Sequence, residues 1–111
     1  MESIHQIGFH EATVVEVQRS DSTITLLLEG VRAADVVSAA SVQLNGIRSI
    51  TRDGLRVDDL VFEYEDGEIL TLERTPTGIH LIVEWTDFKN HKSVTRSYNV
   101  ECDSVKIDVR H

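Results

Sequence analysis

The segment from Leu60 to Trp85 constrains the fold most, because apolar residues occupy every second position across most of it. Side chains of a β-strand alternate between its two faces, so this spacing predicts strands that each have one apolar face. Two groups of turn-forming residues, Glu65-Asp66-Gly67 and Thr75-Pro76-Thr77-Gly78, separate the runs. The segment therefore predicts an antiparallel meander of three strands. These strands are expected over residues 60–64, 68–74 and 79–85.

The register of this meander follows from matching the apolar faces, because a slip of one residue turns every side chain to the opposite face. A two-residue turn at Asp66-Gly67 would set Glu63 against Leu70, whereas a three-residue loop including Glu65 pairs Phe62 with Leu70. At the next turn, a four-residue connection pairs Leu72 with Leu81 and Glu73 with His80. The expected inward face contains Leu60, Phe62, Tyr64, Leu70, Leu72, Ile79, Leu81, Val83 and Trp85.

The same alternation predicts strands in the rest of the chain, with a tight hairpin at Asp53-Gly54. Only Val31 to Val37 could hold a short helix, because its Ala and Asp residues are poor strand formers. The further strands are expected over residues 13–18, 23–29, 38–44, 48–52, 55–57, 93–101 and 105–109. We expect residues 1–111 to form a single all-β domain, an antiparallel sandwich or flattened barrel of about eight strands joined mainly by hairpins.

The net charge of −8, from 19 acidic and 11 basic residues, limits the partners of the chain. It opposes binding to nucleic acid, which needs clustered Lys and Arg, and to anionic membrane surfaces. A basic protein would suit it as a partner, and the alternative is that the charge serves solubility alone. A single cysteine excludes an intramolecular disulfide, and we identify neither a signal peptide nor an apolar run of about 20 residues. A cytoplasmic location is therefore expected.

Seven acidic residues and no Lys or Arg lie between Asp58 and Glu73. In the predicted strand, Glu63 and Glu65 point outward, and Asp66 follows in the turn. One interpretation is a surface that steers a basic partner, with these three residues as binding candidates. The other is a solvated face that discourages pairing between sheet edges.

Three other residues are binding candidates with equally plain structural alternatives. Arg96 falls in the apolar parity between Val94 and Tyr98, so it either grips an anion in a pocket or keeps its head in water at an edge. Glu68 or Glu84 is its expected partner. Trp85 and Phe88, in a loop with much local positive charge, are either binding anchors or lids on the core.

No pattern of catalytic or metal-binding residues is present. The five histidines lack the spacing of a metal motif, no nucleophile elbow or phosphate loop occurs, and Cys102 lies in apolar parity as a small buried hydrophobe. We therefore expect no catalytic residues, no metal and no cofactor, and predict a protein that is not an enzyme.

The opening Gly8-Phe9-His10-Glu11-Ala12-Thr13-Val14, which runs on to Val17 and then Ile24-Thr25-Leu26, resembles the start of many small bacterial all-β proteins. Their first strand begins with a Phe-His-Asp-Ala/Ser-like phrase, in which Glu11 here replaces the usual Asp. Some of these families are uncharacterised, and some resemble immunity proteins of polymorphic toxin systems. In physical terms, Phe9 can plug the core, while His10 and Glu11 can satisfy backbone groups.

Three functional hypotheses remain open at this point. The first is a non-enzymatic acidic module for binding proteins, of the immunity type, that occludes a basic toxin. The second is a carrier of a small molecule or lipid, with the ligand inside the barrel near Tyr64, Arg96 and Tyr98. The third is a structural domain that forms homo-oligomers.

Overall fold

The computed structural model of the chain describes residues 7–33 and 36–110, and it contains ten β-strands. No helix occurs in these residues, and hence none that could cross a membrane. All strand pairs are antiparallel, so the predicted all-β class is confirmed. The strands are β1 (Ile7–Gly8), β2 (Thr13–Ser20), β3 (Thr23–Ala33), β4 (Val36–Asn45), β5 (Ser49–Arg52), β6 (Leu55–Val57), β7 (Asp66–Thr75), β8 (Gly78–Asp87), β9 (Lys92–Glu101) and β10 (Ser104–Arg110).

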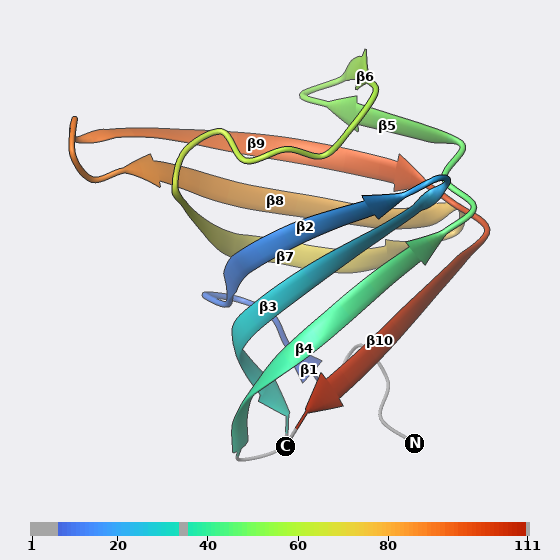
Figure 1. The fold of residues 1–111 in the computed structure, drawn as a ribbon, viewed down its shortest axis with the longest axis horizontal. Helices are drawn as coiled ribbons and strands as arrows, with labels where there is room; N and C mark the ends of the chain where they lie inside the picture. Colours follow the sequence, from blue (N-terminus) through green and yellow to red (C-terminus); the bar gives the residue numbers. More distant parts are fainter. Residues whose placement is uncertain (1–6, 34–35, 111) are drawn as a thin grey trace.

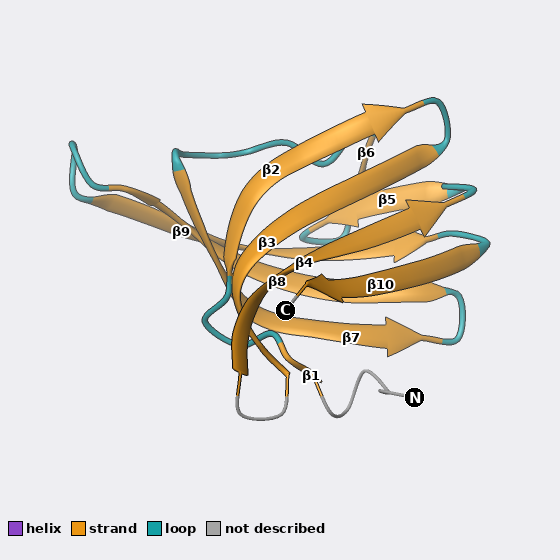
Figure 2. Ribbon diagram, turned by 60° about the horizontal axis from the view of Figure 1, so that its bottom comes forward, coloured by secondary structure: helices purple, strands orange, loops and turns teal. Residues whose placement is uncertain are grey.

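Nine strands form one continuous sheet in the order β10-β4-β3-β2-β7-β8-β9-β5-β6, and β1 pairs with β3. The end strands β10 and β6 do not pair with each other, so the sheet does not close into a barrel. Strands β2 and β7 share a single residue pair, Thr13 with Glu68. At this weak join the sheet folds over on itself, and the half containing β2, β3, β4 and β10 lies across the half containing β7, β8 and β9 (Figures 1 and 2).

The core lies between the two halves, where their apolar faces meet. On β3 and β4 every second residue is buried, as the alternation predicts: Ile24, Leu26 and Leu28 on one strand, and Ala40, Val42 and Leu44 on the other. The opposite half contributes its own alternating set, which is Ile79, Leu81, Val83, Trp85, Tyr98 and Val100. Neither half could bury its apolar face alone, so each stabilises the other.

Hairpins join most neighbouring strands, as predicted. The tight turn at Asp53-Gly54 has a positive φ at both residues (52° and 84°), which is the backbone of the expected two-residue hairpin between β5 and β6. Between β9 and β10, however, the connection forms no hairpin. There the chain crosses from one half of the sheet to the other, because β10 pairs with β4.

The predicted strand over residues 60–64 is wrong. Residues 58–65, which we call the strap, pair with no strand, and Asp66 and Gly67 begin β7 instead of forming a loop. The reason is topological: β6 lies at the edge of the sheet, so the chain must pass over β5, β9 and β8 to reach the place of β7 (Figure 1). The predicted position of the apolar residues nevertheless holds, since Leu60 is buried and Phe62 and Tyr64 pack against the core.

The register of β7 and β8 is correct over half of its length. Leu72 pairs with Leu81 and Glu73 with His80, but a bulge between Ile69 and Thr71 shifts the rest. One extra residue in a bulge changes which side chains face inward. Ile69, instead of the predicted Leu70, therefore pairs with Val83 and enters the core.

The short helix that the sequence allowed for Val31 to Val37 does not form in the part that is described. Residues 31–33 end β3 and residues 36–37 begin β4, with Val31 opposite Ser38 and Arg32 opposite Val37. Their cross-strand pairing, with branched valines on both strands, outweighs the poor strand propensity of the alanines. Ala34 and Asp35 lie outside the described residues.

Gly67 has a role in packing that its sequence context hides. It stands opposite Trp85, and a β-carbon placed on it would collide with the indole ring. We predict that Gly67→Ala lowers the free energy of unfolding by about 1–3 kcal/mol, because the buried ring has no free space to move into. Urea unfolding measures this change. Gly8→Ala is the matched control, since a β-carbon there makes only ordinary contacts, and an equal loss in both variants would contradict the packing.

Candidate functional site

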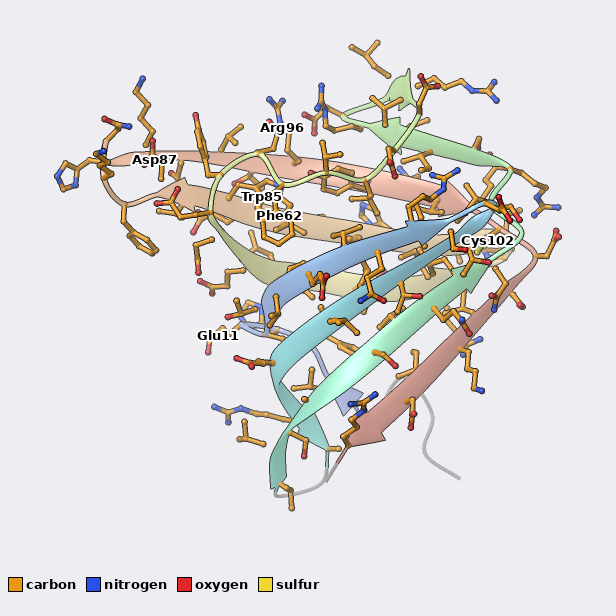
Figure 3. All side chains as sticks on the ribbon, viewed as in Figure 1. Glu11, Phe62, Trp85, Asp87, Arg96 and Cys102 are labelled. Atoms are coloured by element: carbon orange, nitrogen blue, oxygen red, sulfur yellow. The ribbon has the colours of Figure 1, made fainter. Side chains whose placement is uncertain are left out.

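The strap crosses the inner face of β8 and β9, and Phe62, Trp85 and Arg96 lie along it (Figure 3). At its start, Arg19 of β2 binds Asp59, with 3.2 Å between Nη1 and Oδ1. In its middle, Phe62 packs on Trp85 and Glu63 binds two arginines. The strap is thus tied to both halves of the sheet.

Trp85 lies in the core under the strap. It is 1% exposed, and its ring centroid lies 4.9 Å from that of Phe62 with the planes tilted by 49°. Its Nε1 donates a hydrogen bond of 2.8 Å to the hydroxyl of Tyr98, which is also buried. Burial raises the pKa of Tyr98 above its usual value. Of the two interpretations of Trp85, capping of the core is therefore confirmed.

Glu63 is wrongly predicted as outward-facing, and Arg96 has partners other than those expected. Glu63 is 20% exposed and accepts a 2.8 Å hydrogen bond from Arg52. Arg96 Nη1 donates to Asp53 Oδ2 at 2.8 Å, and its Nε lies 3.2 Å from Glu63 Oε1, an ion pair without hydrogen-bond geometry. Glu68 and Glu84 cannot be the partners of Arg96. Each directly precedes a buried residue, Ile69 or Trp85, so both side chains point to the outer face of the sheet.

Hydrogen bonds and ion pairs shift the pKa values of Asp53 and Arg96. The backbone N–H of Ser97 and then the Arg96 guanidinium bind Asp53, and together they lower the pKa of that carboxyl below its usual value. The same hydrogen bond to Asp53, with the charge of Glu63 nearby, raises the pKa of Arg96. Arg96 therefore stays charged and already has two carboxylates bound, so in this structure it holds the strap.

The hairpin between β8 and β9 carries the remaining candidates. Phe88 is 63% exposed, so the alternative that it is a lid on the core is wrong. Its backbone N–H donates to Glu65 Oε1 at 3.3 Å, which connects the end of the strap to the hairpin. Asp87 accepts two hydrogen bonds from Asn90, chiefly through the side-chain amide, and these lower the pKa of its carboxyl. These hydrogen bonds hold the backbone of the turn, from which the side chain of Phe88 extends into solvent.

Near this hairpin, the predicted binding candidates Glu65 and Asp66 lie with two further acidic residues whose pairing the sequence did not predict. Glu68 of β7 stands directly opposite Glu84 of β8, and Asp66 is the next residue of β7 on the same face. With Glu65 they form what we call the acidic patch (Glu65, Asp66, Glu68 and Glu84). In the described part of the chain, no Lys, Arg or His forms an ion pair with any of the four. The bulge at Leu70 creates the pairing of Glu68 with Glu84, so residue spacing alone could not have found it.

The interior positions proposed for a carried ligand are filled by protein contacts. Tyr98 binds Trp85, Arg96 binds the strap, and Tyr64 packs against the core. Two hollows of the described surface, of about 180 and 420 Å³, lie on the outer face of β2, β3 and β4 instead. No group of three or more metal-binding side chains is found within residues 7–33 and 36–110.

Phe9, His10 and Glu11 near the N-terminus, and Cys102, are buried or contact the backbone of β7. Phe9 is buried, as expected of a plug, and His10 Nδ1 lies 3.0 Å from the carbonyl of Leu70. Glu11 contributes its backbone, at a positive φ, by donating to the carbonyl of Ile69. Cys102 is buried, and burial raises the pKa of its thiol, as fits a small hydrophobe.

Comparison of this chain with protein-family models, with curated proteins and with solved structures gives no match. A proposal for its function therefore depends on the residues of the site.

We predict that Tyr98→Phe lowers the free energy of unfolding by about 1–3 kcal/mol, because it leaves the buried N–H of Trp85 without an acceptor. Denaturant unfolding measures the loss. Tyr64→Phe is the control, since the hydroxyl of Tyr64 makes no hydrogen bond to the described residues and should be removed at little cost. Equal stability of Tyr98→Phe and wild type would contradict the buried hydrogen bond.

Proposed function

We propose that the protein is a non-catalytic binding module whose acidic patch, with Phe88 beside it, docks a basic segment of another protein. This is the first of the three hypotheses, now assigned to particular residues. The proposal is supported by the charge of the patch, the exposed aromatic next to it, and the N-terminal resemblance to small bacterial all-β proteins, some of which resemble immunity proteins. Glu63, Trp85 and Arg96 are left out of this surface, because they hold the strap in place.

The observation that carries the proposal is the pairing of Glu68 with Glu84. Like charges directly opposite each other on neighbouring strands are destabilising, by a few tenths to about 1 kcal/mol. Elsewhere this chain places Arg beside its acids, as in Arg19–Asp59, Arg52–Glu63 and Arg96–Asp53. Two carboxylates held opposite each other without an ion pair to any described residue are what a surface needs if a partner is to supply the positive charge.

Phe88 adds an apolar contact to this surface. Its backbone is hydrogen-bonded to Glu65, itself a member of the acidic patch, so Phe88 lies beside these carboxylates. Aromatic side chains that are exposed on a fixed turn are typical centres of protein interfaces. The charge would then speed up association with the partner, while the ring would contribute most of the binding energy that remains at high salt.

The proposal predicts first that Glu84→Lys stabilises the isolated protein. The introduced lysine would stand opposite Glu68 and replace repulsion by attraction, which should raise the free energy of unfolding by a few tenths to about 1 kcal/mol. Glu101→Lys is the control, because it makes the same change of charge on an exposed residue of β9 opposite Ser49 and Gly78. Thermal or urea unfolding of both variants gives the comparison, and a loss of stability specific to Glu84→Lys would contradict it.

Binding is tested with an oligolysine peptide as a defined basic probe, followed by NMR. We expect the largest amide shifts at residues 65–68 and 84–88, with affinity that falls as salt is added. Glu84→Lys should weaken binding more than Glu101→Lys does. Shifts spread evenly over all acidic residues, or equal weakening by the two variants, would show attraction by net charge only and would reject the patch.

A further inference from the structure

Strand β10 ends the sheet with an edge that is open in the described part of the chain. It pairs along its whole length with β4, from Ser104 opposite Asn45 to Arg110 opposite Ala39, and no described strand pairs with its other side. Its seven residues exceed the length at which an edge strand is protected by shortness. The N–H and C=O groups on that side are therefore available to another strand.

The side chains of β10 divide into two sets. Val105, Ile107 and Val109 face the core but are only partly buried. Lys106 and Asp108 face outward and are exposed, and neither forms an ion pair with another described residue. Their neighbours on β4 are the uncharged Gln43 and Ser41, so β4 provides no residue of opposite charge directly across from them.

We propose that β10 pairs antiparallel with β10 of a second copy of this chain, with the two-fold axis at Ile107. In this register Lys106 of each copy stands opposite Asp108 of the other, which gives two cross-strand pairs of opposite charge on the outer face. On the inner face, Ile107 meets its counterpart and Val105 meets Val109. The same surface serves both copies, as a two-fold interface requires, and it completes the burial of the three apolar residues.

Other registers of the same two strands are unfavourable. A shift of the axis to Lys106 sets that lysine against its own copy, and a shift to Asp108 sets aspartate against aspartate and Lys106 against Arg110. An axis between two residues would place apolar side chains opposite charged ones, because every side chain would change face. The sequence of β10 is thus complementary to itself in one register.

One hydrogen bond near the start of β10 must break when the second copy binds. Arg74 Nη2 donates to the carbonyl of Val105 at 3.2 Å. The Arg74 side chain is exposed, so it can move aside for the second copy. The acidic patch lies on β7, β8 and the end of the strap, outside this edge, so the dimer would leave both patches free.

The test is the mass of the protein as a function of concentration, measured by sedimentation equilibrium. Wild type should pass from monomer to dimer as concentration rises. Lys106→Asp, which places aspartates opposite each other twice in the dimer, should raise the dissociation constant at least about tenfold. The double variant Lys106→Asp/Asp108→Lys re-creates both pairs with the charges exchanged and should restore association.

Lys89→Asp serves as the control, since it makes the same change of charge on the hairpin between β8 and β9 and should leave association unchanged. A wild type that remains monomeric throughout would overturn the proposal, and so would a double variant that associates no better than Lys106→Asp. Either result would mean that the charges of β10 serve to prevent pairing of the edge.

Discussion

The contact between Phe62 and Trp85 fixes the path of the strap, and the positions of the site residues follow from that path. The ion pairs of the strap are partly exposed, and pairs of this kind contribute about 0–1 kcal/mol each. Burial of a large apolar side chain contributes about 1.5–3 kcal/mol. The strap is therefore held chiefly by Leu60 and Phe62, while its ion pairs with Arg19, Arg52 and Arg96 contribute less.

Because the strap covers the inner face of β8 and β9, the acids of the strap and of the strands beside it fall into two groups. Those on the strap side, such as Asp59 and Glu63, are bound by arginines and have a structural role. Those on the outer face, Glu68 and Glu84, stand opposite each other, and no Lys, Arg or His within residues 7–33 and 36–110 forms an ion pair with them. The overall charge of −8 hides this division, which is what separates the proposed docking surface from charge that only serves solubility.

Alternation of apolar residues was enough to predict most of the strands, because each half of the sheet buries one face. It failed where the topology of the whole sheet decides the local structure. The parity of 60–64 is that of a strand, and Leu60 and Phe62 do point inward, but β6 lies too far from β7 for a hairpin. Likewise Ile69 replaced Leu70 in the core through a bulge that no single-strand pattern reveals.

The candidate site was predicted less well than the fold, since its contacts join distant parts of the chain. The unusual position of Arg96 correctly indicated that it needs a partner, but Asp53 lies 43 residues away and Glu63 reaches it only through the path of the strap. Phe88 was correctly placed at a turn. Its exposure could not be predicted, because it depends on how far the hairpin of β8 and β9 extends beyond the rest of the sheet. The pairing of Glu68 with Glu84 required the bulge and so was missed.

Trp85 is the single tryptophan of the chain, and its fluorescence tests the central claim, that Phe62 of the strap seals this ring against solvent. In wild type we expect emission at short wavelength and little quenching by acrylamide. Phe62→Ala should shift the emission toward that of a solvated indole and make it open to quenching while the sheet remains folded by circular dichroism. Solvent-like emission in the wild type, or a Trp85 in the folded Phe62→Ala variant that is as protected as before, would contradict the account.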